Sequence, residues 1–297
     1  MIIYKVTNKI NGKIYIGQSV QPLKREGKSD NSDKGYNSTP GGSGTQSGKN
    51  QSISAVLPEG QAVNRKWLNA HGFDRPAIDY YLRSNIIVPL CRGIYRKPGP
   101  RLKWEHVVYS LLELGYTVHV GHKRALQFHG YAHFLQLDGE SAVTLYTERK
   151  TPQWPFELEL TTKLERLSRN PFPETYNRGI EKVPFGSWDW EIPYSSPERA
   201  FIELCSTLDT GVDIVNADKS FEGAGSLRPK LLQDLLENTR QVKAKRLFLW
   251  FARRNAFLWF SEINIDKIEL GSGKRQIVAN GVYDSEFQIT VPKELMD

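Results

Sequence analysis

Four histidines, residues that often bind transition metals, lie close together near the middle of this 297-residue chain: His119, His122, His129 and His133. A zinc or similar site needs three or four such ligands that converge on one point. His119 falls in a short segment with strand character, whereas the other three straddle a predicted helix and its end. We therefore expect histidines that pack or form hydrogen bonds, and no metal site.

The string GSGKR at residues 271–275 suggests a nucleotide-binding loop. A P-loop places its lysine six positions after the first glycine, follows it with Ser or Thr, and opens a helix. Here Lys274 follows Gly271 after only three positions, Arg275 replaces the hydroxyl residue, and an extended segment comes next. We expect a basic β-turn instead. No Ser-His-Asp, Cys-His or paired-carboxylate spacing is evident elsewhere, so we predict no catalytic residues, no cofactor and no enzymatic activity.

A third candidate lies at the N-terminus, where MIIYKVTNKINGKIYIGQS alternates apolar residues on both sides of Asn11-Gly12. Asn-Gly between two such runs predicts a β-hairpin with a type I′ turn over residues 2–17. The string resembles the start of GIY-YIG endonucleases, with one tripeptide intact at residues 15–17 and the other altered to Ile-Ile-Tyr. The resemblance implies active-site roles for Tyr4 and Tyr15, and phosphate binding by Arg25, in a metal-dependent nuclease.

The sequence after Arg25 limits that resemblance. Residues 26–51 are rich in Gly, Ser and Asn and almost free of large apolar residues, which predicts a flexible linker. The linker begins before the glutamate that would hold the metal. We therefore expect residues 1–25 to be a hairpin fragment without chemistry, with a metal-dependent GIY-YIG-type endonuclease as the alternative function.

The composition is that of a soluble globular protein, with 39% hydrophobic and 25% charged residues. No apolar run is long enough to span a membrane, and the first residues do not form a signal peptide. Only two cysteines, Cys91 and Cys205, indicate a reducing cytoplasm. The net charge of +7 is concentrated in residues 1–100 and 227–275. Clustered basic charge favours contact with nucleic acid or an acidic partner.

Residues 52–98 have the pattern of a winged helix-turn-helix. Apolar residues at helical spacing predict a first helix from Ala62 that stops at His71-Gly72. Asp74 as N-cap and Pro76 in the first turn predict a second helix, which would enter the major groove. Extended runs at 86–90 and 93–96 predict a basic hairpin, the wing. The predicted DNA contacts are Arg65, Lys66, Arg75, Tyr80, Arg83, Arg92, Tyr95, Arg96 and Lys97. Winged helices also bind proteins, which leaves a scaffold role open.

Residues 99–297 predict a mixed α+β domain. Helices are expected at 102–114, 122–130, 195–208, 227–239 and 242–255, with a loop at Asp209–Val215. Strands are expected at 117–120, in a hairpin around Asp138-Gly139, and in the runs IDKIEL, KRQIVA and EFQITV. The run LFLWF is apolar on every face and must be buried. We expect a partner surface, either for another protein or for neighbouring DNA-bound copies of the chain, formed by Lys243, Lys245, Arg246, Arg253, Arg254, Lys274 and Arg275.

Residues from about 52 to 292 resemble the AbiEi family, the antitoxins of type IV toxin–antitoxin systems in abortive infection. The resemblance is carried by GIYRKPG at 93–99, ALQFHGYAH at 125–133, SSPERAFIEL at 195–204, and the C-terminal block around IELGSGKRQIV and FQITVP. It implies a winged helix that binds inverted repeats in its own promoter, and a C-terminal domain that neutralises a nucleotidyltransferase-like toxin. The expected partners are therefore double-stranded DNA and that toxin, bound directly or opposed indirectly.

Overall fold

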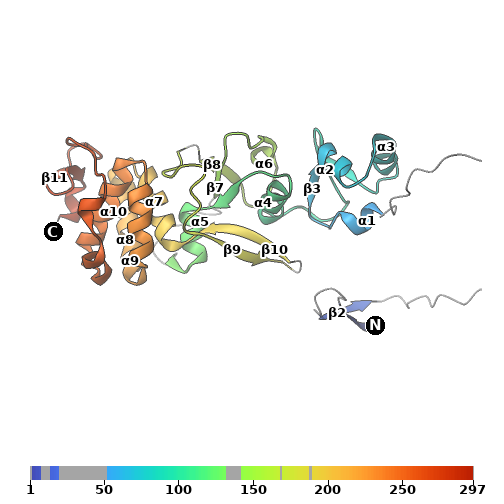
Figure 1. Cartoon of the computed structure of the whole chain (residues 1–297), viewed down its shortest axis with the longest axis horizontal. Coiled ribbons are helices and arrows are strands. Elements are labelled where there is room, and N and C mark those ends of the chain that lie inside the picture. The colour runs from blue at the N-terminus through green and yellow to red at the C-terminus, as the bar shows by residue number, and fades with distance from the viewer. Residues whose placement is uncertain are drawn as a thin grey trace, which may run out of the picture. The chain divides into compact units, whose positions relative to one another are not determined.

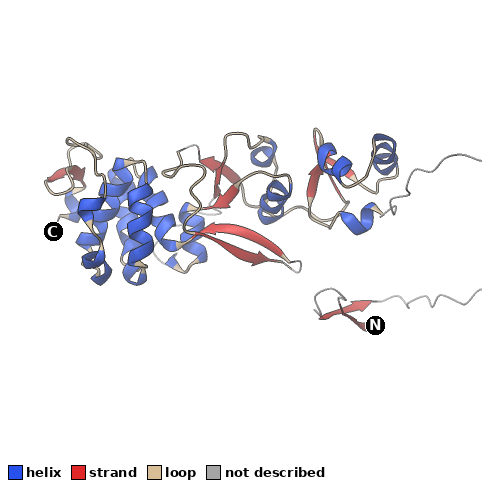
Figure 2. Cartoon of the chain, in the orientation of Figure 1, coloured by secondary structure: helices blue, strands red, loops and turns tan. Residues whose placement is uncertain are grey.

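The computed structural model describes residues 2–7, 14–19, 52–131, 142–167, 169–186 and 189–296. They divide into two units, residues 1–48 and 49–297, each treated by itself below. The first unit contains β1 (Ile2–Thr7) and β2 (Ile14–Ser19). The second unit combines helices with several small sheets, so the predicted α+β class is confirmed (Figures 1 and 2).

The predicted N-terminal hairpin is confirmed as an antiparallel pair of strands, but its register differs from that of a two-residue Asn11-Gly12 turn. Such a turn would pair Thr7 with Ile16. In the structure Thr7 pairs with Ile14. The residues between the strands, Arg25 and the predicted linker at 26–51 lie outside the described residues, and so do the side chains of Tyr4 and Tyr15.

Residues 52–98 form a winged helix. Its elements are α1 (Ile53–Val56), β3 (Ala62–Asn64), α2 (Arg65–Ala70), α3 (Arg75–Arg83), β4 (Val88–Cys91) and β5 (Ile94–Arg96), with strand order β3-β5-β4. The second helix and the wing are confirmed. Asp74 caps α3 by accepting a hydrogen bond from the backbone N–H of Ala77 at 2.9 Å. Ile78 on α3 packs in a separate small core with Trp67 and Leu68.

The prediction of one helix from Ala62 to His71 was wrong in its first part. Val63 pairs with Tyr95 in the wing sheet, so residues 62–64 are a strand. The helix begins only after Asn64, whose side chain accepts a hydrogen bond from the backbone N–H of Trp67 at 2.8 Å. The backbone geometry of an N-cap is extended, which lets one residue end a strand and begin a helix.

A five-stranded sheet with order β8-β7-β6-β10-β9 follows the winged helix. Its strands are β6 (Val118–Val120), β7 (Val143–Thr147), β8 (Leu164–Leu167), β9 (Ile180–Phe185) and β10 (Trp190–Ser195), with helices α4 (Trp104–Glu113), α5 (His122–Phe128) and α6 (Trp154–Glu157) beside them. The predicted strands at 117–120 and after Asp138-Gly139 are confirmed, whereas the first strand of that hairpin lies outside the described residues. The long β9–β10 hairpin, yellow in Figure 1, packs on α4 through stacked Tyr109 and Trp190.

The C-terminal helices are α7 (Pro197–Thr207), α8 (Gly211–Phe221), α9 (Pro229–Asn238) and α10 (Val242–Arg254). The predicted loop at Asp209–Val215 was wrong, because Thr210 and Asp213 form a capping box that starts α8. Of the three predicted C-terminal strands only EFQITV contains one, β12 (Ile289–Val291), which pairs with β11 (Val282–Asp284). IDKIEL contains a 3-10 turn at Ile265–Lys267, and KRQIVA contributes a single bridge from Arg275 to Ile289.

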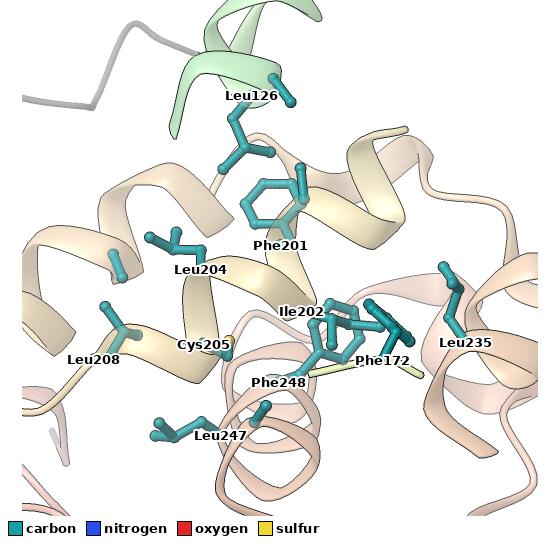
Figure 3. Close-up of a cluster of buried hydrophobic side chains, with 14 of the residues drawn as sticks. Leu126, Phe172, Phe201, Ile202, Leu204, Cys205, Leu208, Leu235, Leu247 and Phe248 are labelled. Atoms are coloured by element: carbon teal, nitrogen blue, oxygen red, sulfur yellow. The ribbon is translucent and has the colours of Figure 1, made fainter. Parts of the chain in front are cut away.

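The main core is built around α7, which is buried along almost its whole length. Figure 3 shows Leu126 of α5 on one side of α7, and Leu247 and Phe248 of α10 on the other. The residues of LFLWF are at most 2% exposed, so the predicted burial of that run is confirmed. Removing this much apolar surface from water is the dominant stabilising term of the domain.

The winged helix is firmly attached to the rest of this unit. The Ser110 hydroxyl on α4 accepts a hydrogen bond from the backbone N–H of Ala62 on β3 at 2.8 Å. Ala62 and Ile94, both in the wing sheet, also belong to the main core. Contacts therefore cross the domain boundary that the sequence predicts between residues 98 and 99.

Candidate nucleic-acid interface

The face of α3 opposite the buried Ile78 is open to solvent and basic. Arg75 has a side chain 85% exposed, and Tyr80 is 56% exposed. Arg83, two turns after Arg75, is also exposed. The sequence predicted these three as DNA contacts, and the structure places them together on one side of one helix.

A carboxylate, Asp79, lies among these arginines on the same helical face. Its Oδ1 accepts a hydrogen bond from Nη2 of Arg65 on α2 at 3.1 Å, and its Oδ2 lies 3.8 Å from Nε of Arg75. Its backbone carbonyl accepts a bond from Nε of Arg83 at 3.3 Å. Asp79 was not among the predicted site residues. The sequence did carry a signal for this contact. In RPAIDYYLR, Asp79 lies four residues after Arg75 and four before Arg83, a spacing that brings side chains together on a helix.

Tyr95 supports Arg65 from the wing sheet. It is 8% exposed, and its hydroxyl accepts a hydrogen bond from Nε of Arg65 at 3.1 Å. The hydrogen bonds with Tyr95 and then Asp79 raise the pKa of the Arg65 guanidinium above its ordinary value. A side chain buried to this degree does not lie against a duplex, so we reassign Tyr95 from DNA contact to support of Arg65.

Two of the basic side chains predicted to contact DNA from the wing are bound within the protein. Arg96 donates to the carbonyls of Gly99 and Pro100, and Lys97 donates to the carbonyl of Ser54 at 2.7 Å. Arg92, in the turn before Gly93, is exposed, as is Lys66 on α2. The side chains that stay available for a duplex are Lys66, Arg75, Tyr80, Arg83 and Arg92, hereafter the basic face, with Arg65 beside them.

Two of the predicted partner-surface cations are buried in the C-terminal domain. Lys245 is 3% exposed and donates to the carbonyl of Glu269, and burial lowers its pKa. Arg246 is 1% exposed and donates to the carbonyls of Leu270, Gly271, Gly273 and Gln288. These two residues therefore hold the GSGKR turn in place and do not form a contact surface.

Three further cations of that predicted surface are engaged in ion pairs. Lys243 pairs with Asp209, Arg253 with Asp284 and Glu286, and Arg254 with Asp218. Arg253 thereby ties α10 to the β11–β12 hairpin. Lys274 and Arg275 are exposed at the GSGKR turn, with Lys274 over the Tyr283 ring at 4.8 Å. Only these last two, of the seven predicted, present a charge without an acidic partner.

His119 and His122 belong to a buried hydrogen-bond network centred on Glu203. Glu203 on α7 is fully buried and accepts bonds from His119 at 3.1 Å, from the backbone N–H of His122 at 3.1 Å, from Ser195 and from Arg199 at 2.9 Å. Burial alone would raise the pKa of Glu203, but these donors lower it below its ordinary value. Burial lowers the pKa of His119, which favours a neutral ring.

Three of the four clustered histidines, His119, His122 and His129, form hydrogen bonds within the protein. His122 forms a hydrogen bond with the Thr207 hydroxyl at 2.7 Å, and His129 donates to the carbonyl of Ser195 at 3.0 Å. Among the residues that the structure describes, no three His, Cys, Asp or Glu side chains are grouped so as to hold a metal ion. His133 lies outside them.

A family model described as "Transcriptional regulator, AbiEi antitoxin, Type IV TA system" matches residues 140–292, and a model of the AbiEi antitoxin N-terminal domain matches residues 46–137. No curated protein matches the sequence. Among solved structures, the crystal structure of RV2827C protein from Mycobacterium tuberculosis aligns with a TM-score of 0.49 and 12% identity, over 78% of this chain and 86% of that chain. No helix in the described part of the chain is long and apolar enough to cross a membrane.

Proposed function

The chain belongs to the AbiEi family of antitoxins, the transcriptional regulators of type IV toxin–antitoxin systems, and on this premise we propose that it binds and represses its own promoter. The observation that carries the proposal is the basic face of the winged helix. Cations around an exposed helix and wing suit a helix that enters the major groove while the wing contacts the backbone. Two copies on inverted repeats would each place one such helix in one half-site.

The first test is binding to the DNA upstream of the gene. We expect a mobility shift at low salt that weakens steeply as salt rises, because each phosphate that a Lys or Arg neutralises adds about 0.9 to the slope of log affinity against log salt. A duplex of the same length with the inverted repeats scrambled is the control and should bind more weakly. If the upstream duplex is not shifted even at low salt, the repressor function is excluded.

We further propose that the chain neutralises a nucleotidyltransferase-like toxin, and that Lys274 and Arg275 belong to the surface that does so. Both side chains are exposed, and the turn that carries them is held by three bonds that Arg246 donates to carbonyls of residues 270–273. A rigid turn loses little conformational entropy when a partner binds. Arg253 and Arg254 are unsuitable for testing the surface, since reversing their charges would also break ion pairs to Asp284 and Asp218.

A charge-reversed variant with Lys274→Glu and Arg275→Glu should therefore lose rescue of cells that co-express the adjacent toxin gene, while thermal denaturation stays close to wild type. The matched control is Lys230→Glu with Lys267→Glu, two other exposed lysines of the same domain. Undiminished rescue by the Lys274/Arg275 variant removes these residues from the toxin surface. Equal loss of rescue in both variants would mean that the net charge of the domain, and not these two positions, determines neutralisation.

A further inference from the structure

Asp79 stands out because it places a negative charge between Arg65 and Arg75, among the cations of the winged helix. A surface built only to hold phosphates gains nothing from a carboxylate there, since like charges repel at close range. Asp79 is about 40% exposed, so it is not a core residue forced into this position by packing. Its carboxylate contacts Arg65 and Arg75, whereas Arg83 bonds only to its backbone carbonyl, which indicates that the role of the side chain is to orient Arg65 and Arg75.

We propose that Asp79 is a positioning residue that holds Arg65 and Arg75 so that they read guanine edges in the major groove, and that it thereby sets the sequence preference of the protein. This inference rests on the proposed DNA-binding function. Bidentate arginine contact to O6 and N7 of guanine is the commonest specific contact in the major groove.

Arg65 has the geometry that such a contact needs. Its Nε donates to the Tyr95 hydroxyl and its Nη2 donates to Asp79, so the guanidinium is fixed from two elements, β5 and α3. A guanidinium has five N–H donors. Two are used, and three remain for the two acceptors of a guanine. Because the fork is already oriented, binding costs less side-chain entropy than it would for a free arginine.

Arg75 is held more loosely, by its 3.8 Å approach to the same carboxylate one helical turn away. A single carboxylate thus lies between two guanidinium groups on different helices. Neutralising Asp79 would release Arg75 and leave Arg65 held by Tyr95 alone, so that both could contact phosphates in several orientations, while the repulsion between the carboxylate and the DNA backbone would be removed. We therefore expect a loss of sequence preference without a loss of general affinity.

The experiment compares the full-length wild type with three variants: Asp79→Asn, Asp79→Glu as a conservative rescue, and Glu59→Gln as a charge-matched control on an exposed residue of the same domain. The probe is a duplex selected by the wild type from a pool with a randomised central segment. It is compared with a scrambled duplex of equal length, and with versions in which single guanines are replaced by 7-deazaguanine, which lacks the N7 acceptor.

Asp79→Asn should lower the preference for the selected over the scrambled duplex by about tenfold, within the range that one bidentate arginine–guanine pair contributes. It should also lose the sensitivity to 7-deazaguanine at one or more positions. Asp79→Glu should keep part of the sequence preference and part of the sensitivity to 7-deazaguanine, and Glu59→Gln should behave as wild type.

Unchanged preference and unchanged 7-deazaguanine sensitivity in Asp79→Asn would overturn the inference. It would also be overturned by equal weakening on both duplexes together with a lower Tm, which would make Asp79 a structural residue. A different outcome is that the wild type binds no duplex in the pool in a salt-sensitive way. That result would remove the DNA-binding function and this inference together.

Discussion

Replacing Arg75 and Arg83 together by alanine is expected to weaken binding to the selected duplex by at least about 30-fold. An arginine that contacts base edges contributes about 1–3 kcal/mol, and each 1.4 kcal/mol is a factor of ten in affinity. The fold should be little affected, because Arg75 only approaches Asp79 and Arg83 donates only to a carbonyl of its own helix. Fluorescence anisotropy with labelled duplex measures the change.

A matched control separates recognition from overall charge. Arg149→Ala with Arg240→Ala removes the same two charges from exposed positions outside the winged helix. This control should bind the duplex within a few-fold of wild type. If the two double variants lose affinity equally, Arg75 and Arg83 are not part of the recognition surface. Long-range electrostatic attraction alone would then explain their effect on binding.

Glu203→Gln is expected to lower the free energy of unfolding by about 3–5 kcal/mol, the cost of breaking a buried ion pair from one side. Arg199 is 1% exposed and would keep its charge in the core with neutral partners alone: the new amide at position 203, the carbonyls of Tyr176 and Arg178, and the Phe172 ring. His119 and Ser195 would lose a charged acceptor as well. Urea denaturation monitored by tryptophan fluorescence measures the change.

Glu181→Gln provides the control for this variant, since it makes the same chemical change in an Arg–Glu pair that is about half exposed. Surface pairs contribute about 0–1 kcal/mol, so this variant should be near wild type. The pH dependence adds a second test. The folded-state pKa of Glu203 is lowered, so its contribution is present above the ordinary carboxyl pKa and is lost as the pH falls through the folded value. Glu203→Gln should lack that part of the acid sensitivity, and a variant as stable as wild type would contradict the role of the network.

Local signals predicted α3 and the wing, because Asp74, Pro76 and the turn at Gly93 each specify structure through their own backbone geometry. The strand at residues 62–64 was missed because so short a segment becomes a strand only by pairing with another. Here Val63 pairs with Tyr95, some thirty positions away in the sequence. The start of α8 was missed for a different reason. Its capping box uses Asp213 where Glu or Gln is the usual signature.

Which charged residues are available to a partner could not be predicted from sequence. Periodicity treats charged residues as solvated, yet Arg246 is buried by carbonyls of a turn more than twenty positions later in the chain. Arg253 is likewise neutralised by Asp284 and Glu286 from the β11–β12 hairpin. For the basic face the sequence places Arg75, Tyr80 and Arg83 on one helix, but only the tertiary structure shows Asp79 and Tyr95 holding Arg65.

Because Ala62 bonds to Ser110, and Ala62 and Ile94 pack in the main core, we expect the winged helix and the C-terminal helices to unfold as one cooperative unit. A ligand that binds only the folded state raises the free energy of unfolding of every element that unfolds with its site. DNA held by α3 would therefore slow hydrogen exchange in α7 and α10, which lie in the main core away from the basic face. If the chain binds its promoter as proposed, promoter occupancy and the stability of the C-terminal domain would in this way be thermodynamically linked within a single chain.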